Sequence, residues 1–336
     1  MNEGLGGALG QRIEIRVDPA EAGNRLDVAL ARLAPALSRS RVQKLVESSR
    51  VLVDGRPAKP ATRLRGGERI EVALPDPEPT DLVAQDLPIS VLYEDGDLLV
   101  LDKRAGMVVH PARGAPHSTV LNALLHRLGS GPGERLGLVH RLDKDTSGCL
   151  LVARTEAALA SLQQQFRGRT VEKTYLALCH GCLADEGVID TAYGRHPRDR
   201  TRFTSRLRAA RRAVTRFRAV ARFGALATLA EVGLETGRTH QIRVHLSEAG
   251  HPLLADATYG GARREARLAV EHPVRRAAAA IGRQALHAWR LAFDHPRTGR
   301  RLRVEAPLPA DLLAALAVLG LRPPAARSAG NPPGRA

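Results

Sequence analysis

A proline-rich acidic segment constrains how this chain of 336 residues can fold. Residues 75–88 hold four prolines and four acidic residues, and no basic one. Proline fixes its own φ and lacks an amide hydrogen, so such a segment is extended and semi-rigid. We therefore expect a small module at residues 12–75, a linker at residues 76–88 and a larger domain at residues 89–321.

The two ends of the chain are expected to be disordered tails. Residues 1–11 are rich in glycine, and residues 322–336 form a basic segment with several prolines. Neither segment has enough apolar side chains to offset the conformational entropy that ordering would cost. We therefore expect both folded parts to lie within residues 12–321.

The small module combines helical periodicity with a hairpin signal. Apolar residues recur at helical spacing in 24–34, and Ser38 can cap a second helix that ends at Val46. Asp54-Gly55 is a hairpin turn signal, and residues 69–74 read as a last strand. This pattern predicts a small α/β module.

The charge of the small module favours contact with RNA phosphates. Nine basic and three acidic residues lie between Arg39 and Arg69. Clustered cations of this kind contact phosphate oxygens, although a solvated charged surface is the alternative. The residues that we predict to bind RNA here are Arg39, Arg41, Lys44 and Arg56.

Three stretches of the small module resemble a known RNA-binding module. RLDVALA, SRSRVQKLV, and RVLVDG followed by GGERIEV are similar to the module named after ribosomal protein S-four. Ser49 and Asp54 stand where that pattern usually has Gly and Asn. The resemblance implies an RNA-binding role for this part of the chain.

The overall charge points to a polyanionic partner. The chain carries 51 Lys and Arg against 35 Asp and Glu, a formal net charge of +16. Such an excess favours nucleic acid or an anionic membrane surface, although the preponderance of Arg over Lys also fits a GC-rich genome. No stretch has the roughly 20 apolar residues of a membrane span. We therefore expect an RNA partner and no membrane.

Cofactor and metal motifs are not evident in the sequence. No Gly-rich phosphate loop occurs, which argues against a nucleotide cofactor. Cys179 and Cys182 have CxxC spacing, but no second ligand pair completes a zinc site. Three cysteines and no evident signal peptide fit a reducing compartment. We expect a cytoplasmic protein with neither cofactor nor metal.

The larger domain reads as an α+β fold. Short apolar strands at 98–101, 150–153, 174–179 and 227–235 alternate with helical stretches at 155–167 and 240–248. These segments do not form regular βαβ units. The pattern predicts one domain built around a mixed sheet.

The segment HRLDKDTSG, residues 140–148, is the first candidate for chemistry. It places Asp143 between the cations Arg141 and Lys144 in a turn. A nearby cation keeps a carboxylate ionised, and an oriented carboxylate can act as a nucleophile. On turn chemistry alone, the alternative is local capping of the backbone by Asp143.

Two further segments supply polar groups that could join Asp143. Tyr175 lies in the apolar strand EKTYLALCHG, where a buried hydroxyl needs a partner and could move a proton. We expect Thr239 to cap a helix that projects Arg243, whose guanidinium can hold a carboxylate. The alternatives are a structural tyrosine and a surface arginine.

Together these segments resemble the RluA-type pseudouridine synthases, and within them the RluD-like branch. The resemblance rests on HRLDKDTSGCLLVART, EKTYLALCHG and GLETGRTHQIRVHLSEAGHPLLADATYGG, in the order of the family. It implies a catalytic domain with a mixed, largely antiparallel sheet. It also implies isomerisation of uridines to pseudouridine without a cofactor, in large-subunit (23S) ribosomal RNA. Arg104, Ala255 and Ala257 depart from the family pattern, where Pro, Gly and Pro are usual.

The resemblance also assigns roles to residues of this chain. Asp143 would be the nucleophile, Tyr175 the proton acceptor, and Arg243 the residue that positions Asp143. Arg141 would fill the space left by the target uridine. The further residues that we predict to bind substrate are His140, Thr239 and His240.

A second basic segment predicts additional contacts with RNA. Residues 195–222 contain eleven arginines and one acid, Asp199. We predict that Arg202, Arg211 and Arg212 contact RNA, while a disordered basic loop is the alternative. We expect a monomer.

Two other functions remain as alternatives at this stage. A non-catalytic RNA-binding factor for ribosome assembly would carry the same basic surface. A retaining glycoside hydrolase would use Asp143 together with Asp145, which requires the two carboxylates to lie about 5 Å apart.

Overall fold

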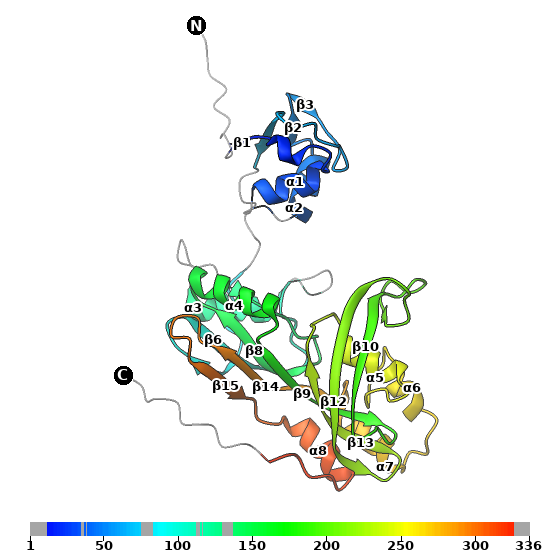
Figure 1. Ribbon diagram of the computed structural model, residues 1–336. Coiled ribbons are helices and arrows are strands. Elements are labelled where there is room, and N and C mark those ends of the chain that lie inside the picture. The colour runs from blue at the N-terminus through cyan, green and yellow to red at the C-terminus, as the bar shows by residue number, and fades with distance from the viewer. Residues whose placement is uncertain are drawn as a thin grey trace. The chain divides into compact units, whose positions relative to one another are not determined.

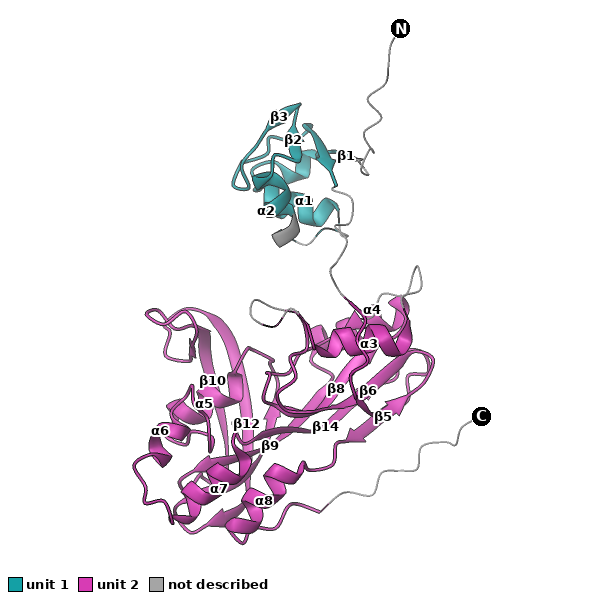
Figure 2. Ribbon diagram, turned by 180° about the vertical axis from the view of Figure 1, so that it is seen from behind, with its two compact units in different colours: residues 1–81 teal, residues 82–336 magenta. Residues whose placement is uncertain are grey.

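The computed structural model describes residues 12–34, 37, 39–74, 83–111, 115, 117–129 and 137–325. The chain divides into two compact units, residues 1–81 and 82–336 (Figure 2). The tail expected at residues 1–11 and most of the tail at residues 322–336 lie outside the described residues; residues 322–325 have no regular secondary structure.

The first unit is a small antiparallel sheet with two helices. Its elements are β1 (Arg12–Arg16), the 3-10 helix η1 (Pro19–Glu21), α1 (Leu26–Leu33), α2 (Arg39–Glu47), β2 (Val51–Val53), β3 (Arg56–Pro57) and β4 (Arg69–Ala73). The strand order is β1-β4-β2-β3. Leu26, Leu30, Val42 and Ile70 are fully buried between the helices and the sheet. The predicted small α/β module is therefore confirmed.

The two residues of the first unit that depart from the usual pattern of the resembling module have left-handed backbones. Ser49 has φ 57° and Asp54 has φ 48°, and Asp54 forms the predicted hairpin turn with Gly55 between β2 and β3. Gly and Asn adopt this conformation most readily, because most side chains crowd the following carbonyl oxygen there. The backbone therefore explains why the usual residues at these positions are Gly and Asn.

The second unit is built on an eleven-stranded sheet (Figure 1). The strand order is β11-β10-β12-β13-β9-β14-β8-β6-β5, with β15 beside β14 and β7 beside β8. All pairs are antiparallel except β14 with β8. The predicted α+β class with a mixed, largely antiparallel sheet is confirmed.

The strands and helices of the second unit alternate only in part, because β9 to β13 follow one another without a helix and α5 to α7 without a strand. The strands are β5 (Ser90–Glu94), β6 (Leu98–Lys103), β7 (Gly137–Leu138), β8 (Ser147–Ala153), β9 (Glu172–His180), β10 (Glu186–Arg195), β11 (Phe203–Thr204), β12 (Arg211–Phe223), β13 (Ala227–Leu234), β14 (Leu286–Asp294) and β15 (Arg301–Glu305). The helices are α3 (Val120–Leu128), α4 (Glu156–Gly168), α5 (Gln241–Glu248), α6 (Gly261–Glu265), α7 (Pro273–Ile281) and α8 (Ala310–Val318). No helix among the described residues is long and apolar enough to cross a membrane.

The central strand β9 separates two apolar layers. Tyr175 and Ala177 belong to a core with residues of α3 and α5, whereas Leu176 and Leu178 belong to a core with residues of α7 and α8. Successive side chains of a strand point to opposite faces. One face of β9 therefore carries Tyr175 toward α5, and the other face anchors the sheet.

The residues just before β5 are hydrogen-bonded to the second unit. The side-chain amide of Asn122 in α3 donates to Val83 O at 2.8 Å, and the main-chain carbonyl oxygen of Asn122 accepts from Gln85 N at 3.1 Å. Arg104 donates to Pro88 O at 2.8 Å. Residues 83–88, the second half of the expected linker, are thus tied to this unit, while residues 76–82 lie outside the described residues.

The cap predicted for α5 is wrong. His240, and not Thr239, precedes the first residue of the helix, and it has a left-handed backbone with φ 59° and no capping hydrogen bond from its side chain. Gln241 instead accepts from Arg238 N at 3.0 Å through its side chain. The carbonyl oxygen of Thr239 accepts from the Tyr193 hydroxyl at 2.6 Å. The Gln241 side chain and the contact from Tyr193 therefore replace the cap that the sequence suggests.

Gly148 closes the segment HRLDKDTSG for a steric reason. Its φ is 107°, and a Cβ at this position would lie 2.2 Å from Ala288 O of β14. Gly148 pairs with Ala288 where β8 and β14 run parallel. The turn that carries Asp143 can therefore join the sheet only if residue 148 has no side chain.

Gly148→Ala is expected to lower the free energy of unfolding by about 3 kcal/mol, because a left-handed alanine is strained and its methyl group overlaps the β14 backbone. Gly233→Ala is the control, since the nearest atom to its Cβ would be 4.0 Å away. Urea unfolding monitored by circular dichroism measures both variants. Equal stabilities of the two variants would contradict this explanation.

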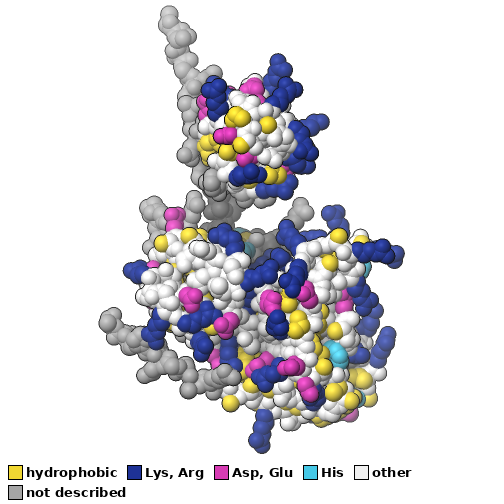
Figure 3. All heavy atoms as spheres, viewed as in Figure 1, with side chains coloured by type: hydrophobic (Ala, Val, Ile, Leu, Met, Phe, Trp, Pro, Cys, Tyr) yellow, Lys and Arg dark blue, Asp and Glu magenta, His cyan; other side chains and the backbone are white. Residues whose placement is uncertain are grey.

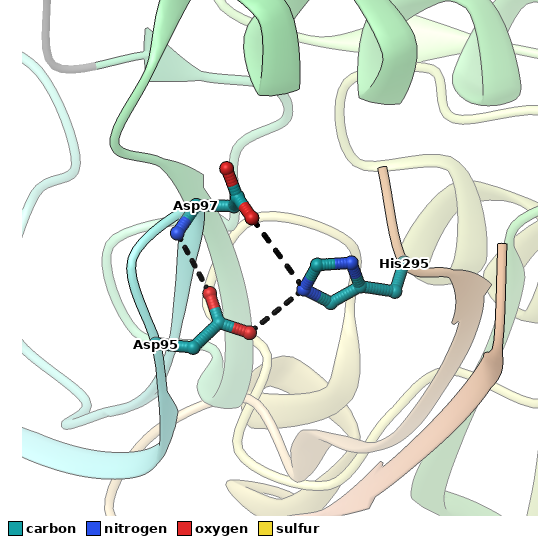
Figure 4. A group of neighbouring side chains, drawn as sticks. All are labelled: Asp95, Asp97 and His295. Atoms are coloured by element: carbon teal, nitrogen blue, oxygen red, sulfur yellow. Dashed lines mark hydrogen bonds and ion pairs between the residues drawn. The ribbon is translucent and has the colours of Figure 1, made fainter. Parts of the chain in front are cut away.

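A partly buried, hydrogen-bonded cluster joins the β5–β6 turn to the β14–β15 turn (Figure 4). His295 Nε2 lies 2.8 Å from Asp95 Oδ2, and Arg297 donates to Asp97 at 2.6 Å. His295 Nδ1 accepts from the amides of Arg297 and Thr298 at 3.2 Å each. Both ring nitrogens of His295 are thus engaged within the protein, and we interpret this acidic cluster as a structural clamp.

The clamp predicts acid-sensitive stability. Burial opposes the charge of Asp95, but hydrogen bonds from Tyr93, the amides of Asp97 and Leu98, and His295 lower the pKa of Asp95 below its usual 3.8. A carboxylate with a lowered pKa stabilises the fold above its unfolded pKa and loses that contribution as the pH falls.

We expect Asp95→Asn to destabilise the protein most at neutral pH. The difference from the wild type is expected to shrink as the pH falls from about 5 through the lowered pKa of Asp95. Urea unfolding between pH 7 and pH 3 measures it. Asp185→Asn is the control, because the Asp185 side chain is 90% exposed. Its free energy of unfolding should differ little from that of the wild type at any pH in this range. A pH-independent loss in Asp95→Asn would rule out an electrostatic clamp.

Candidate active site

A cleft of about 580 Å³ opens beside β9 in the second unit. Its walls are the turn at residues 139–143, the end of α4, the start of β9, the segment 234–240 and the first turn of α5. All seven residues predicted for catalysis or substrate binding line this cleft: His140, Arg141, Asp143, Tyr175, Thr239, His240 and Arg243. Three segments that are distant in sequence therefore meet at one place.

The turn that carries Asp143 is held from behind by two buried cations. Lys103 Nζ donates to the carbonyl oxygens of Lys144, Arg104 and Met107 at 2.8–2.9 Å. Arg283 donates to Asp145 O at 2.9 Å. Because these bonds fix main-chain atoms, the turn presents the Asp143 side chain to the cleft with little freedom.

Arg243 lies between two carboxylates. Its Nε and Nη2 donate to Asp256 at 2.6 and 2.9 Å, and its Nη1 lies 3.4 Å from Asp143 Oδ2. Asp256 is fully buried, the Arg243 side chain is 7% exposed, and the Asp143 side chain is 17% exposed. Bidentate pairing fixes the guanidinium plane, so that one edge remains for the more exposed Asp143.

Asp256 is a site residue that the sequence analysis did not identify. Besides Arg243, it accepts from the amides of Thr258 and Tyr259 at 2.9 Å each. The preceding residue, Ala255, has a left-handed backbone with φ 56°, which explains why glycine is usual there. The only signal in the sequence was a single acid within the motif LLADATYGG, which gives no indication of its partner.

Tyr259 extends the same network by packing its ring against the Arg243 guanidinium. The Arg243 guanidinium lies 5.0 Å from the centre of the Tyr259 ring, a cation–π contact. The Tyr259 hydroxyl lies 2.9 Å from His240 Nδ1 and accepts from Phe203 N at 3.0 Å. His240 Nε2 lies 3.9 Å from Asp143 Oδ1. Both oxygens of Asp143 therefore face groups that this network orients.

The hydroxyl of Tyr175 remains protonated at neutral pH. Burial, together with the nearby charge of Asp143, raises the pKa of Tyr175 far above its usual value. The phenol oxygen can therefore accept a proton only if it passes its own proton to another group. If Tyr175 is the proton acceptor that the resemblance implies, it must therefore give up its own proton as it takes another.

The two histidines of the cleft are neutral. Burial and the nearby charge of Lys173 lower the pKa of His140 to about 3, and Leu151 N donates to His140 Nε2 at 2.9 Å. Burial also lowers the pKa of His240, despite the neighbouring Asp143. Neither histidine supplies a positive charge at neutral pH, so the arginines and Lys173 supply the cations of the cleft.

The cations predicted to bind RNA in the first unit differ in their surroundings. Arg39 donates through Nε and Nη2 to the fully buried Asp27 at 3.0 Å, a carboxylate that Arg25 also contacts, so its guanidinium is tied to the unit. Lys44 and Arg56 are exposed, and the side chain of Arg41 lies outside the described residues. Lys44 and Arg56 are therefore the better placed of these residues to meet phosphate.

The arginine-rich segment 195–222 lies among the described residues and is mostly strand. Its second half forms β12, where four arginines pair with acids of β10, β13 and adjoining turns. These pairs are Arg212–Asp190, Arg216–Glu235, Arg218–Glu231 and Arg222–Asp185. The disordered-loop alternative is therefore wrong, and the local charge is lower than the segment alone suggests. On the face of the second unit that Figure 3 shows, acidic side chains lie among the basic ones.

Arg202 and Arg211, which we also predict to contact RNA, differ in their distance from the cleft. Arg211 is exposed at the start of β12, and the Arg202 guanidinium lies 5.3 Å from the Tyr259 ring centre. Arg202 is thus close to the cleft through Tyr259, whereas Arg211 and Arg212 do not line it.

The geometry does not support the alternative of a retaining glycoside hydrolase. That reading requires Asp143 and Asp145 as a pair of carboxylates, and Asp145 does not line the cleft.

Comparison with known proteins agrees with this arrangement. Residues 97–248 match the family model described as RNA pseudouridylate synthase, and residues 24–70 match the model of the S4 domain. A protein of Xanthomonas campestris pv. campestris named ribosomal large subunit pseudouridine synthase D is 44% identical over 314 residues. That match covers 93% of this chain and 92% of the relative. A protein of the same name from Nitrosomonas europaea is 44% identical, over 90% of this chain and 87% of that protein.

Solved structures share the fold of the second unit. Human RNA pseudouridylate synthase domain containing 4 is 27% identical, with a TM-score of 0.54 over 70% of this chain and 95% of that one. Human RNA pseudouridylate synthase domain containing 1 is 28% identical, with a TM-score of 0.53 over 71% and 90%. With its two-unit fold, its cleft and these relatives, the chain belongs to the RNA pseudouridylate synthase family. Membership in a family of isomerases favours the enzyme over a non-catalytic assembly factor.

Asp256→Asn is expected to lower the free energy of unfolding by about 3 kcal/mol or more, since it leaves the buried Arg243 without its charged partner. Urea unfolding at neutral pH measures this loss. Asp190→Asn removes a carboxylate from an exposed arginine pair and is the matched control, for which we expect little change. Similar small effects in both variants would contradict a supporting role for Asp256.

Proposed function

We propose that this protein converts specific uridines of large-subunit (23S) ribosomal RNA to pseudouridine, with Asp143 as the nucleophile. The observation that carries this proposal is the placement of Asp143 against Arg243 in the cleft, 3.4 Å apart and beside Tyr175. The choice of RNA is supported by relatives at 44% identity that are named for the ribosomal large subunit.

The residue types fit the chemistry of the isomerisation. The N1–C1′ bond of uridine breaks, the uracil turns, and a C5–C1′ bond forms while C5 loses its proton. Asp143 attacks C1′ of the sugar, which displaces N1 of the uracil, or adds to C6 of the base, and Arg243 keeps its carboxylate charged and aimed. The bond from Asp143 to carbon breaks again as the C5–C1′ product forms, which regenerates the carboxylate, and N1 takes up a proton. Tyr175 accepts the proton of C5 and passes on its own. No redox change or group donor is involved, so we expect no cofactor.

Substrate binding requires that the target uridine leave the RNA stack. Unstacking costs a few kcal/mol, and less in a loop or bulge. Arg141, which is exposed at the mouth of the cleft, fills the space that the uridine leaves. His140, Thr239 and His240 contact the flipped nucleotide. The first unit and Arg202, Arg211 and Arg212 add contacts to the RNA backbone, and the protein acts as a cytoplasmic monomer.

Asp143→Asn is expected to lower the single-turnover rate by at least ~10³-fold while changing RNA affinity by no more than about twofold, because it removes the nucleophile but not the basic surface. Pseudouridine mapping at nucleotide resolution provides the test in cells. RNA from a strain that lacks the gene is compared after complementation with the wild type or with Asp143→Asn. Sites should return only with the wild type.

Asp145→Asn is the matched control two residues away, since Asp145 lies in the same turn but does not line the cleft. We expect this variant to restore every site. If Asp143→Asn also restored the sites, the nucleophile would be another group. If the deletion changed no site in any RNA, the proposed reaction or its assigned substrate would be wrong.

A further inference from the structure

Lys173 occupies a position in the cleft that the proposed reaction leaves unexplained. It lies on β9 two residues before Tyr175, so both side chains project from the same face of the strand, and both line the cleft. Lys173 is only 9% exposed. A lysine is rarely buried to this degree unless an anion is near.

No anion within the described part of the chain pairs with Lys173. Its ammonium forms neither a hydrogen bond nor an ion pair with any described residue, and its nearest aromatic contact is the Phe166 ring, with a centroid 5.7 Å away. By contrast, the buried Lys103 donates three hydrogen bonds to carbonyl oxygens. Of these two buried lysines, only Lys103 is accounted for by the fold.

The surroundings of Lys173 add positive charge. Arg167 and Arg169, at the end of α4, are exposed and line the same cleft. Burial, together with Arg169, lowers the pKa of Lys173, which indicates that the site as it stands lacks a counter-charge. The acids that line the cleft are already engaged, since Asp143 faces Arg243 and Glu235 pairs with Arg216.

The other groups at this end of the cleft are neutral. His140 stacks on Phe166 with ring centroids 5.1 Å apart, and its Nε2 accepts from the amide of Leu151. Three cations therefore line the cleft that Asp143 also lines, and Lys173 lies beside two uncharged rings. An anion that enters here gains charge-assisted hydrogen bonds at little cost in new desolvation of Lys173.

We propose that Lys173, with Arg167 and Arg169, binds a backbone phosphate of the RNA beside the target uridine. This inference rests on the proposed function, because RNA is the polyanion that the cleft would admit. A phosphodiester supplies a single negative charge and two non-bridging oxygens, which suit one ammonium and a neighbouring guanidinium. The contact adds affinity for the RNA and makes Lys173 a residue for binding and not for chemistry.

The test uses the full-length protein and a short RNA stem-loop that contains one mapped target uridine. Lys173→Met keeps the apolar stem but removes the charge, and we expect it to raise the dissociation constant about 10-fold, equivalent to ~1.4 kcal/mol. The slope of log affinity against log salt is expected to fall by about one phosphate contact. The single-turnover rate at saturating protein should stay within about twofold. Lys173→Arg should restore most of the affinity.

Methylphosphonate substitution locates the contact. Replacing one phosphate next to the target uridine by an uncharged methylphosphonate should weaken binding by the wild type and have little further effect on Lys173→Met. Arg303→Met, at an exposed position of β15 outside the cleft, is the charge-matched control and should behave as the wild type. Should Lys173→Met fail to fold, Arg169→Met carries the same test from an exposed position.

Three results would overturn the inference. They are an unchanged affinity in Lys173→Met, a lower rate at saturation with unchanged affinity, and additive effects of the variant and every methylphosphonate. Formation of pseudouridine by the wild type reports separately on the proposed function. If the wild type binds the RNA but forms no product, that function fails, while the binding measurements still decide whether Lys173 holds a phosphate.

Discussion

The buried pair between Arg243 and Asp256 is the interaction on which the cleft depends. Removing two charges from water costs several kcal/mol per ion, and only close, well-directed hydrogen bonds offset that cost. Asp256 meets this condition with two bonds to Arg243 and two to backbone amides. The guanidinium is therefore fixed before any substrate arrives, and its remaining edge faces Asp143. The same loop positions Tyr259, and through it His240, around the other oxygen of Asp143.

Four cations around the Asp143 turn fall into two groups with different tasks. Lys103 and Arg283 lie behind the Asp143 turn and donate to its carbonyl oxygens, so their charges stabilise the turn. Arg141 and Lys173 lie in the cleft itself, without a carboxylate partner among the described residues. Pinning the turn from behind thus leaves the front of the cleft available for RNA.

Sequence motifs predicted which residues form the site, but they did not predict how the charges around it are paired. Asp143, Tyr175 and Arg243 were identified from three short segments, and the structure brings them together around one cleft. The charge of segment 195–222 was overestimated, because acids of neighbouring strands pair with four of its arginines. Thr239 was wrongly expected to cap α5. In both cases a partner distant in sequence decided the outcome, and no local pattern encoded it.

The sequence by itself determined the small α/β module, the α+β class of the larger domain and the family. These follow from local features: proline content, the alternation of apolar residues and motifs of fixed length. Only the tertiary structure decided which acid holds Arg243, why residue 148 must be glycine, and which buried lysine has no anion partner among the described residues. The physical reason is that steric overlap and Coulomb energy depend on separation in space. Gly148 and Ala288 are 140 residues apart in the chain, yet they are neighbours in the sheet.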